Sequence, residues 1–195
     1  MKPAVAAFDQ FSADYDRWFD TNQDIYKGQL SCLRSHIPSS GTGLEIGAGS
    51  GRFAAPLKIR YCLDPSRQLL LIARQRGMET VQGTGESLPW RCGVFDFVLM
   101  MTVICFMDSP DEAFCEACRV LRPGGTLIIG FFDRNGEIAR QEEMRSPRGQ
   151  FLRYAKFWSA DEVRRSLARS GFTAGEIRED LHGISLAIAQ KESHP

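Results

Sequence analysis

This sequence has no excess of charge of either sign, no long apolar run and few histidines. Its 195 residues include 24 Lys and Arg and 24 Asp and Glu, so the formal net charge is zero. A surface that binds nucleic acid normally shows as a basic excess, so we expect no nucleic-acid partner. The longest apolar run, Phe95–Met107, contains Asp96 and falls short of the about 20 residues that a spanning helix needs. We therefore expect no membrane partner.

The cysteines and the N-terminus both favour a reducing compartment. The six cysteines are scattered among apolar neighbours and do not have the spacing of a small secreted framework. The N-terminal stretch MKPAVAAFDQFSADYD becomes acidic and aromatic too early for a signal peptide. We expect reduced thiols in a cytoplasmic protein. Cys115 and Cys118 share one face of a predicted helix, where we expect them to fill the core and bind no metal.

The composition otherwise suits one globular domain. Hydrophobic residues make up 43% and charged residues 25% of the chain, which argues against disordered and fibrous proteins. We see no internal repeat and no linker long enough to separate two domains. We expect a single domain over residues 1–195, acting as a monomer or a homodimer. Its parts would be an N-terminal helical cap (1–40), a core (41–133), a variable substrate-side segment (134–158) and a C-terminal helix and strand pair (159–195).

Short apolar runs alternate with helical spacing in the core segment, which indicates a mainly parallel sheet covered on both faces. Two amphipathic helices are expected first, over residues 8–19 and 24–36. A short helix limited by Pro56 is expected in the first crossover. Strands are predicted at 43–47, 61–64, 79–82, 95–101 and 126–132, with helices at 66–76 and 110–121.

The C-terminal part carries a helix signal and a pair of closing strands. Ser159 and Glu162 have the spacing of a capping box, with the helix continuing to Ser170 and Gly171 as its C-cap. The runs 173–178 and 183–190 are predicted to pair antiparallel at the edge of the sheet.

The segment LEIGAGSGRF, residues 44–53, is the most informative motif. Its glycines at 47, 49 and 51 follow a buried strand, and glycine lets backbone and ligand approach closely. Dinucleotide enzymes need the spacing G-x-G-x-x-G, but Arg52 stands at that third glycine position. The acidic Glu45 also disfavours a pyrophosphate. The pattern instead suits a ligand with an amino-acid end and a sulfonium.

With these residues the sequence resembles the class I S-adenosylmethionine-dependent methyltransferases, and within them the group that includes the ubiquinone/menaquinone biosynthesis methyltransferases. Five motifs carry the resemblance in the family's order: EIGAGSGRF, LDPS (63–66), GTGESLPW (83–90), the stretch 94–113 and EACRVLRPGG (116–125). The resemblance implies a Rossmann-like three-layer α/β/α sandwich. Its seven-stranded, mostly parallel sheet would have the order 3-2-1-4-5-7-6 and an antiparallel edge strand.

The resemblance also implies a cofactor, S-adenosyl-L-methionine, its product S-adenosyl-L-homocysteine, and a small-molecule methyl acceptor. Asp64 would accept hydrogen bonds from both ribose hydroxyls, although Asp-Pro-Ser is also ordinary turn chemistry. Thr84 replaces the family's acidic adenine contact, and Tyr15 and Trp18 would either cap the cofactor or simply bury one helix face. The expected cofactor-binding residues are Glu45, Gly47, Ala48, Gly49, Gly51, Asp64, Pro65, Thr84, Gly85, Glu86, Ser87, Met101, Thr102, Val103, Tyr15 and Trp18.

No residue is predicted as the catalytic base. The histidines, His36, His182 and His194, are not placed for this role. A missing base favours a thiol, an acidic phenol, an enol or an activated carbon as acceptor. Arg148, Arg153 and Tyr154 are available to an anionic substrate. The alternatives left open are a protein or RNA methyltransferase, a non-catalytic cofactor-binding module and, more distantly, a nucleotide-dependent oxidoreductase.

Overall fold

One mostly parallel sheet organises the chain. The computed structural model describes residues 2–147, 149–179 and 183–192. The sheet has seven strands in the order β3-β2-β1-β4-β5-β7-β6, which confirms the expected order. Strands β1 to β5 pair parallel with one another, whereas β7 is antiparallel to both β5 and β6. The strands are β1 (Gly43–Ile46), β2 (Tyr61–Asp64), β3 (Glu79–Gln82), β4 (Phe95–Met101), β5 (Leu121–Phe131), β6 (Phe172–Glu179) and β7 (Ser185–Lys191).

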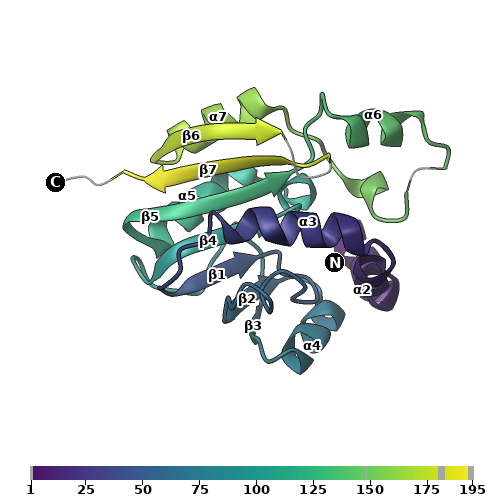
Figure 1. Cartoon of the computed structure of the whole chain (residues 1–195), viewed down its shortest axis with the longest axis horizontal. Helices are drawn as coiled ribbons and strands as arrows, with labels where there is room; N and C mark the ends of the chain where they lie inside the picture. Colours follow the sequence, from purple (N-terminus) through teal and green to yellow (C-terminus); the bar gives the residue numbers. More distant parts are fainter. Residues whose placement is uncertain (1, 148, 180–182, 193–195) are drawn as a thin grey trace.

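Helices cover both faces of the sheet and give three layers (Figure 1). One face buries apolar residues of α5 and α7, among them Phe114 and Leu167. The other face packs against Leu33 of α3 and against residues 53–59 of the first crossover. The helices are α1 (Pro3–Gln10), α2 (Ser12–Thr21), α3 (Gln23–Arg34), α4 (Arg67–Gln75), α5 (Pro110–Val120), α6 (Glu137–Met144) and α7 (Ala160–Arg169), with short 3-10 turns η1 (Ile104–Phe106) and η2 (Leu152–Tyr154).

In the C-terminal part the capping box and the antiparallel strand pair are confirmed, whereas α7 ends at Arg169 with Ser170, and not Gly171, as its C-cap. The Ser159 hydroxyl accepts the N–H of Glu162, and the Glu162 carboxylate accepts the N–H of Ser159, so α7 begins with a capping box. Gly171 follows the helix with a positive φ of 84°. The two closing strands pair antiparallel as expected.

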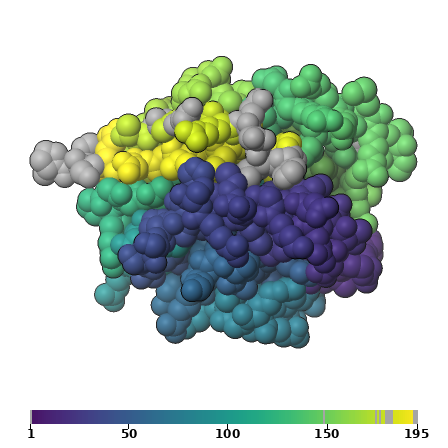
Figure 2. All heavy atoms as spheres, in the orientation of Figure 1, coloured from purple at the N-terminus to yellow at the C-terminus, as the bar shows by residue number. Residues whose placement is uncertain are grey.

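The N-terminal cap differs from the prediction, because it contains three helices and not two. The chain leaves helical geometry at Phe11, whose φ and ψ are −114° and 29°. This bend lets α1 pack against α4, whereas α2 lies over the glycine turn. In Figure 2 the N-terminal helices (purple to blue) cover the middle of this face and lie against the segment that holds β2 and α4.

Three smaller expectations are also wrong. The first crossover forms turns and no helix: Pro56 lacks an N–H, and Lys58 adopts a left-handed φ of 59°. Strand β5 begins earlier than expected, since Leu121 already pairs with Phe95 of β4. Cys115 is exposed, with its Sγ 3.6 Å from Ser170 Oγ, because it lies at the rim of the α5–α7 contact. Among the described helices, none has the length and apolarity to cross a membrane.

Candidate functional site

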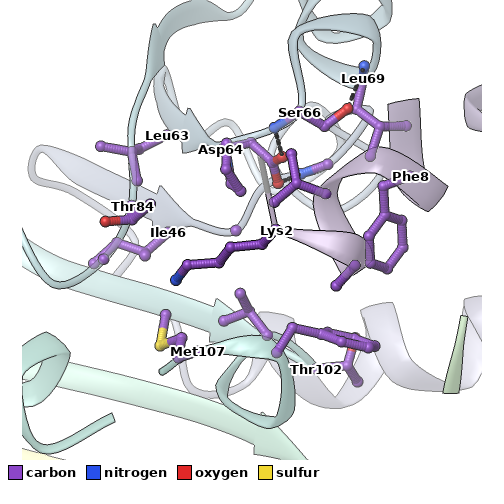
Figure 3. Close-up of a pocket in the computed structure, with 18 of the residues that line it drawn as sticks. Lys2, Phe8, Ile46, Leu63, Asp64, Ser66, Leu69, Thr84, Thr102 and Met107 are labelled. Atoms are coloured by element: carbon purple, nitrogen blue, oxygen red, sulfur yellow. Dashed lines mark hydrogen bonds between the residues drawn. The ribbon is translucent and has the colours of Figure 1, made fainter. Parts of the chain in front are cut away.

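A pocket lies at the carboxyl ends of β1, β2 and β4, beneath helix α1 (Figure 3). This is the edge of an open α/β sheet where ligands bind in general. Three parts of the chain meet there: the N-terminal cap, the strand ends and the loop after β3. The lining residues are Lys2, Ala4, Val5, Phe8, Tyr15, Ile46, Gly47, Gly49, Leu63, Asp64, Pro65, Ser66, Leu69, Thr84, Gly85, Glu86, Met101, Thr102, Val103, Phe106 and Met107.

The glycine turn forms the floor of this pocket. Gly47 and Gly49 have φ values of 72° and 53°, a region that favours glycine. A Cβ on Gly47 would lie 2.2 Å from Val103 Cγ2, and one on Gly49 would lie 3.0 Å from the Tyr15 ring. Both positions therefore need a bare backbone, and the first could not take a side chain without moving its neighbours.

Asp64 ends β2 and ties the turn to the start of α4. Its Oδ2 accepts the N–H of Gly49 at 2.8 Å, and its Oδ1 accepts the N–H of Ser66 at 2.8 Å. The side chain is buried. Burial raises the pKa of Asp64 to about 6, although the two backbone hydrogen bonds oppose that shift. Each carboxylate oxygen has a second lone pair, so the group can accept two further hydrogen bonds from a ligand.

The N-terminal helices form the roof of the pocket. Val5 and Phe8 of α1 and Tyr15 of α2 line it. Asp9 fixes α1 to the N-terminus of α4, because its Oδ1 accepts from Ser66 Oγ at 2.6 Å and from the N–H of Gln68 at 3.0 Å. Tyr15 is half-buried, and its pKa is raised by desolvation and by the nearby charge of Asp64, so it stays a neutral phenol.

The loop after β3 forms the far wall. A Cβ on Gly85 would lie 2.7 Å from Met107 Cε, so this backbone also lies close to its neighbours. The Glu86 carboxylate accepts the N–H of Asp108 at 3.1 Å and lies 3.9 Å from Lys2 Nζ. Lys2 also pairs with Asp108 at 2.6 Å. The N-terminus of the cap is therefore held by charge at this wall.

The end of β4 carries a strained residue. Thr102 has a φ of 52°, which is unusual for a β-branched side chain and costs about 1–3 kcal/mol. Its N–H donates to the Gly130 carbonyl at 2.7 Å. Phe106 follows in η1 and contacts Phe8 edge to face, with centroids 5.1 Å apart. Phe8 in turn stacks on Phe151 at 4.7 Å. This end of the pocket is therefore mostly apolar and aromatic.

Most of the residues expected at the site do line the pocket. They are Gly47, Gly49, Asp64, Pro65, Thr84, Gly85, Glu86, Met101, Thr102, Val103 and Tyr15. The structure does not bring Glu45, Ala48, Gly51, Ser87 or Trp18 to it.

The reasons for these exceptions are physical. Glu45 is buried on the side of β1 opposite to Leu44 and Ile46, and its Oε2 has no hydrogen-bond partner among the described residues. Burial raises its pKa well above the ordinary value. Trp18 is 42% exposed, because the buried position of that helix turn belongs to Phe19.

Some candidates cannot be placed, and others lie elsewhere. Arg148, His182 and His194 fall outside the described residues. Arg153 and Tyr154 line a second hollow on the outer side of α1, together with Gln10 and Gln150. His36 lies at the end of α3, where its Nδ1 is 2.9 Å from the Cys32 carbonyl. Arg153, Tyr154 and His36 are therefore not part of the main pocket.

The pocket residues contributed by α1 and its N-cap, chiefly Lys2, Val5 and Phe8, were not predicted from the sequence. Val5 and Phe8 are three residues apart, so a separate short helix would have placed them on one face. The continuous helix assumed from residue 8 hid that signal. Ser66 was expected only within a motif, but its hydroxyl caps α4 by accepting the N–H of Leu69.

Known proteins resemble this chain along most of its length. The family model "Methyltransferase domain" matches residues 44–129. An uncharacterized protein of Methanocaldococcus jannaschii is 42% identical over 165 residues, covering 85% of this chain and 80% of that protein. A malonyl-[acyl-carrier protein] O-methyltransferase of Geobacter sulfurreducens is 32% identical over 190 residues, covering 89% of this chain and 71% of that enzyme.

A solved structure shows the same architecture. The S-adenosylmethionine-dependent methyltransferase of Thermotoga maritima, described as a candidate histamine N-methyltransferase, superposes with a TM-score of 0.89 at 33% identity, covering 97% of this chain and 100% of that one. The family of these relatives is thus the one that the glycine turn and the carboxylate at the end of β2 suggest. The chain belongs to the S-adenosylmethionine-dependent methyltransferases, with S-adenosyl-L-methionine as its cofactor.

Proposed function

We propose that this protein transfers the methyl group of S-adenosylmethionine to a small-molecule acceptor. The observation that carries the proposal is the roof of the pocket: Val5, Phe8 and Tyr15 close it from the cap side. A residue on a folded macromolecule would have to pass this roof, whereas a small molecule can enter alone. The zero net charge also gives no general attraction to nucleic acid.

The residues present fit the cofactor. The floor is bare backbone at Gly47 and Gly49, where a Cβ would meet Val103 or Tyr15. Asp64 offers two oxygens that each already accept one N–H and can each accept one ribose hydroxyl. Its pKa of about 6 leaves it mainly ionised at neutral pH. We assign Asp64 to the ribose and the glycine turn to the amino-acid end of the cofactor.

The adenine would lie at the wall formed by the loop after β3. Gly85 gives the ring access to the backbone, and Ile46, Leu63 and Met107 give it apolar surfaces. Thr84 is uncharged, so Glu86 is the acidic group nearest to this wall. Its carboxylate already accepts the N–H of Asp108, which fixes its direction.

The methyl group, supplied by the sulfonium of the bound cofactor, would be transferred at the β4 end of the pocket. Met101, Val103 and Phe106 give this end of the pocket an apolar lining, and Thr102 contributes a hydroxyl-bearing side chain. Among the described lining residues, the titratable ones are Lys2, Tyr15, Asp64 and Glu86. None of these is a free base beside Thr102, because Tyr15 holds its proton and the other three lie at the ribose or adenine wall. Orientation and desolvation must therefore provide most of the rate.

This absence of a base favours acceptors that bind already deprotonated. A thiol, an acidic phenol, an enol and an activated carbon all meet that condition. A carboxylate does as well, and the Geobacter sulfurreducens relative is named for a malonyl carrier-protein substrate. That name makes a carrier-bound acid the second candidate. The cysteines are scattered among apolar neighbours and do not have the spacing of a small secreted framework, which supports a reducing compartment that we propose to be the cytoplasm.

The test is transfer of radiolabelled methyl from S-adenosylmethionine to a panel containing a thiol, a phenol, histamine, malonyl-coenzyme A, a malonyl-loaded carrier protein and an RNA. The control enzyme is Asp64→Ala, which should bind the cofactor poorly and turn over none of the panel. Turnover of a free small molecule supports the proposal. Labelling only of a carrier protein or RNA, or cofactor binding without turnover of any acceptor, would contradict it. Binding of NADH in place of the sulfonium cofactor would contradict the site assignment itself.

A further inference from the structure

One carboxylate of α2 accepts hydrogen bonds from three other residues. Asp16 Oδ1 accepts hydrogen bonds from Ser50 Oγ at 2.6 Å and from Arg52 Nε at 2.8 Å. Its Oδ2 accepts from Arg52 Nη2 and from Arg76 Nη2, both at 2.8 Å. Its backbone carbonyl also accepts from Arg52 Nη2 at 2.9 Å. We call Asp16, Ser50, Arg52 and Arg76 the α2 clamp.

The α2 clamp is shielded from water. The exposed side-chain fractions are 18% for Asp16, 16% for Arg52 and 25% for Arg76. Burial opposes the ionisation of Asp16, but the hydrogen bonds from Arg52, Arg76 and Ser50 outweigh it and hold the pKa of this carboxyl well below its usual range. Hydrogen bonds to charged groups are the stronger ones in proteins, and loss of one partner leaves a partly desolvated charge.

A second ion pair on the same helix has none of these properties. Asp14 pairs with Arg17 at 3.0 Å, with 54% and 69% of the two side chains exposed. This pair joins two positions of α2 to each other and, within the described part of the chain, reaches no other element. Exposed pairs of this kind contribute little to stability, so Asp14 is a matched control for Asp16.

The α2 clamp fixes the floor of the cofactor pocket relative to its roof. Ser50 and Arg52 directly follow the glycine turn, and Arg76 Nη1 also holds the Ser50 carbonyl at 2.7 Å. On the other side, Tyr15 precedes Asp16 and lies over Gly49, where a Cβ would be 3.0 Å from its ring. Neither Asp16 nor the two arginines line the pocket. They can therefore affect a ligand only through the position of Tyr15 and of the turn.

We propose that Asp16 is a positioning residue: through Arg52 and Arg76 it sets the fraction of molecules in which α2 lies closed over the glycine turn, and so sets cofactor affinity. This inference rests on the proposed location of the cofactor beneath Tyr15. When only part of a population is competent to bind, apparent affinity falls in proportion to that part. Cofactor binding must equally favour the closed position of α2, since the two equilibria are linked.

The first experiment measures S-adenosylhomocysteine affinity by calorimetry for Asp16→Asn, Arg76→Gln and the double variant. If the closed fraction falls to about a tenth, Asp16→Asn binds about tenfold more weakly. Arg76→Gln weakens binding in the same direction, and the double variant is less affected than the product of the two single effects, because both remove one shared interaction. Asp14→Asn binds as the wild type does. Strict multiplication of the two effects, or equal loss in Asp14→Asn, would overturn the proposal.

The second experiment needs no ligand. Hydrogen exchange of the α2 amides is compared with that of the α7 amides in the wild type, Asp16→Asn and Asp14→Asn. The proposal expects about tenfold faster exchange in α2 of Asp16→Asn alone, with α7 unchanged. Equal acceleration in both helices would mean a merely global loss of stability and would overturn it. Should the wild type bind no S-adenosylhomocysteine, the proposed cofactor site fails, but this exchange comparison still decides whether the clamp holds α2.

Discussion

Replacement of Asp64 by Asn probes the centre of the site with almost no change in shape. The carboxylate accepts the N–H groups of Gly49 and Ser66, one on each oxygen. An Asn side chain has only one oxygen, so its NH₂ group must face one of these donors. One buried N–H then loses its acceptor, and one ribose hydroxyl loses a charged acceptor.

The magnitude follows from the ribose contact. A hydrogen bond to a charged group contributes about 1.5–3 kcal/mol, which corresponds to a loss of affinity of roughly ten- to a hundredfold. We expect this loss for S-adenosylhomocysteine binding to Asp64→Asn, measured by calorimetry at pH 7.5. Urea unfolding of the same variant corrects for any change in the folded fraction. Unchanged affinity in a fully folded variant would remove Asp64 from the ribose site.

The pH dependence gives an independent check. Burial raises the pKa of Asp64 from 3.8 to about 6, so the cofactor-free protein loses this carboxylate below about pH 6. If the ionised form accepts the ribose hydroxyls, affinity is constant above pH 6 and falls by about tenfold for each unit below it. Asp64→Asn should show no such step.

The same pKa shift affects the stability of the fold in the opposite direction to cofactor affinity. A raised carboxyl pKa favours the protonated native state. Its contribution to stability is therefore fully present below pH 3.8 and is lost as the pH rises through about 6. Acid thus weakens binding without unfolding the protein through this group. A flat binding profile for the wild type would refute the assignment.

Three further changes test the floor, the roof and the edge of the fold. Gly47→Ala places a Cβ 2.2 Å from Val103 at a φ of 72° and should abolish S-adenosylhomocysteine binding. The control Gly93→Ala, at a φ of 67° with no atom within 4 Å of the added Cβ, should lower the free energy of unfolding in urea by only about 1 kcal/mol. Equal effects of the two variants would contradict the close packing at Gly47. Tyr15→Ala should weaken S-adenosylhomocysteine binding, whereas Trp18→Ala, at the 42% exposed position, should not. If calorimetry showed the larger loss of affinity for Trp18→Ala, the assignment of Tyr15 to the roof would be wrong. Ser159→Ala removes the cap of α7 and should lower the free energy of unfolding by about 1 kcal/mol with unchanged binding; no loss in urea unfolding would mean that the cap is not stabilising.

The parts of the fold that were predicted correctly depend on local patterns. Strands β2 and β4 occupy the predicted residues, because continuous apolar runs bounded by polar or turn residues define them. The capping box at Ser159 could be predicted from the sequence because both of its members lie within one helix turn. The glycine turn could also be predicted, because few residues other than glycine readily adopt the positive φ values that the turn requires.

The failures have physical reasons as well. Helical spacing continues through Phe11, so periodicity alone could not show the bend between α1 and α2. Leu121 was predicted to end the preceding helix, yet the register irregularity between Phe95 and Phe97 allows Leu121 to pair with Phe95 and β5 to begin there. Glu45 belongs to the family motif, but the pleat of β1 turns its side chain away from the pocket.

The sequence by itself determined the order of the elements, the glycine turn and the acidic residue at the end of β2, since these follow from backbone preferences over a few residues. Only the tertiary structure decided which side chains of the cap meet the site. Tyr15 and Trp18 lie on one helix, yet one lines the pocket and the other is 42% exposed. Asp16 finds partners 34, 36 and 60 residues away along the chain. Such contacts depend on how the helices cross one another, and that geometry results from the packing of the whole core.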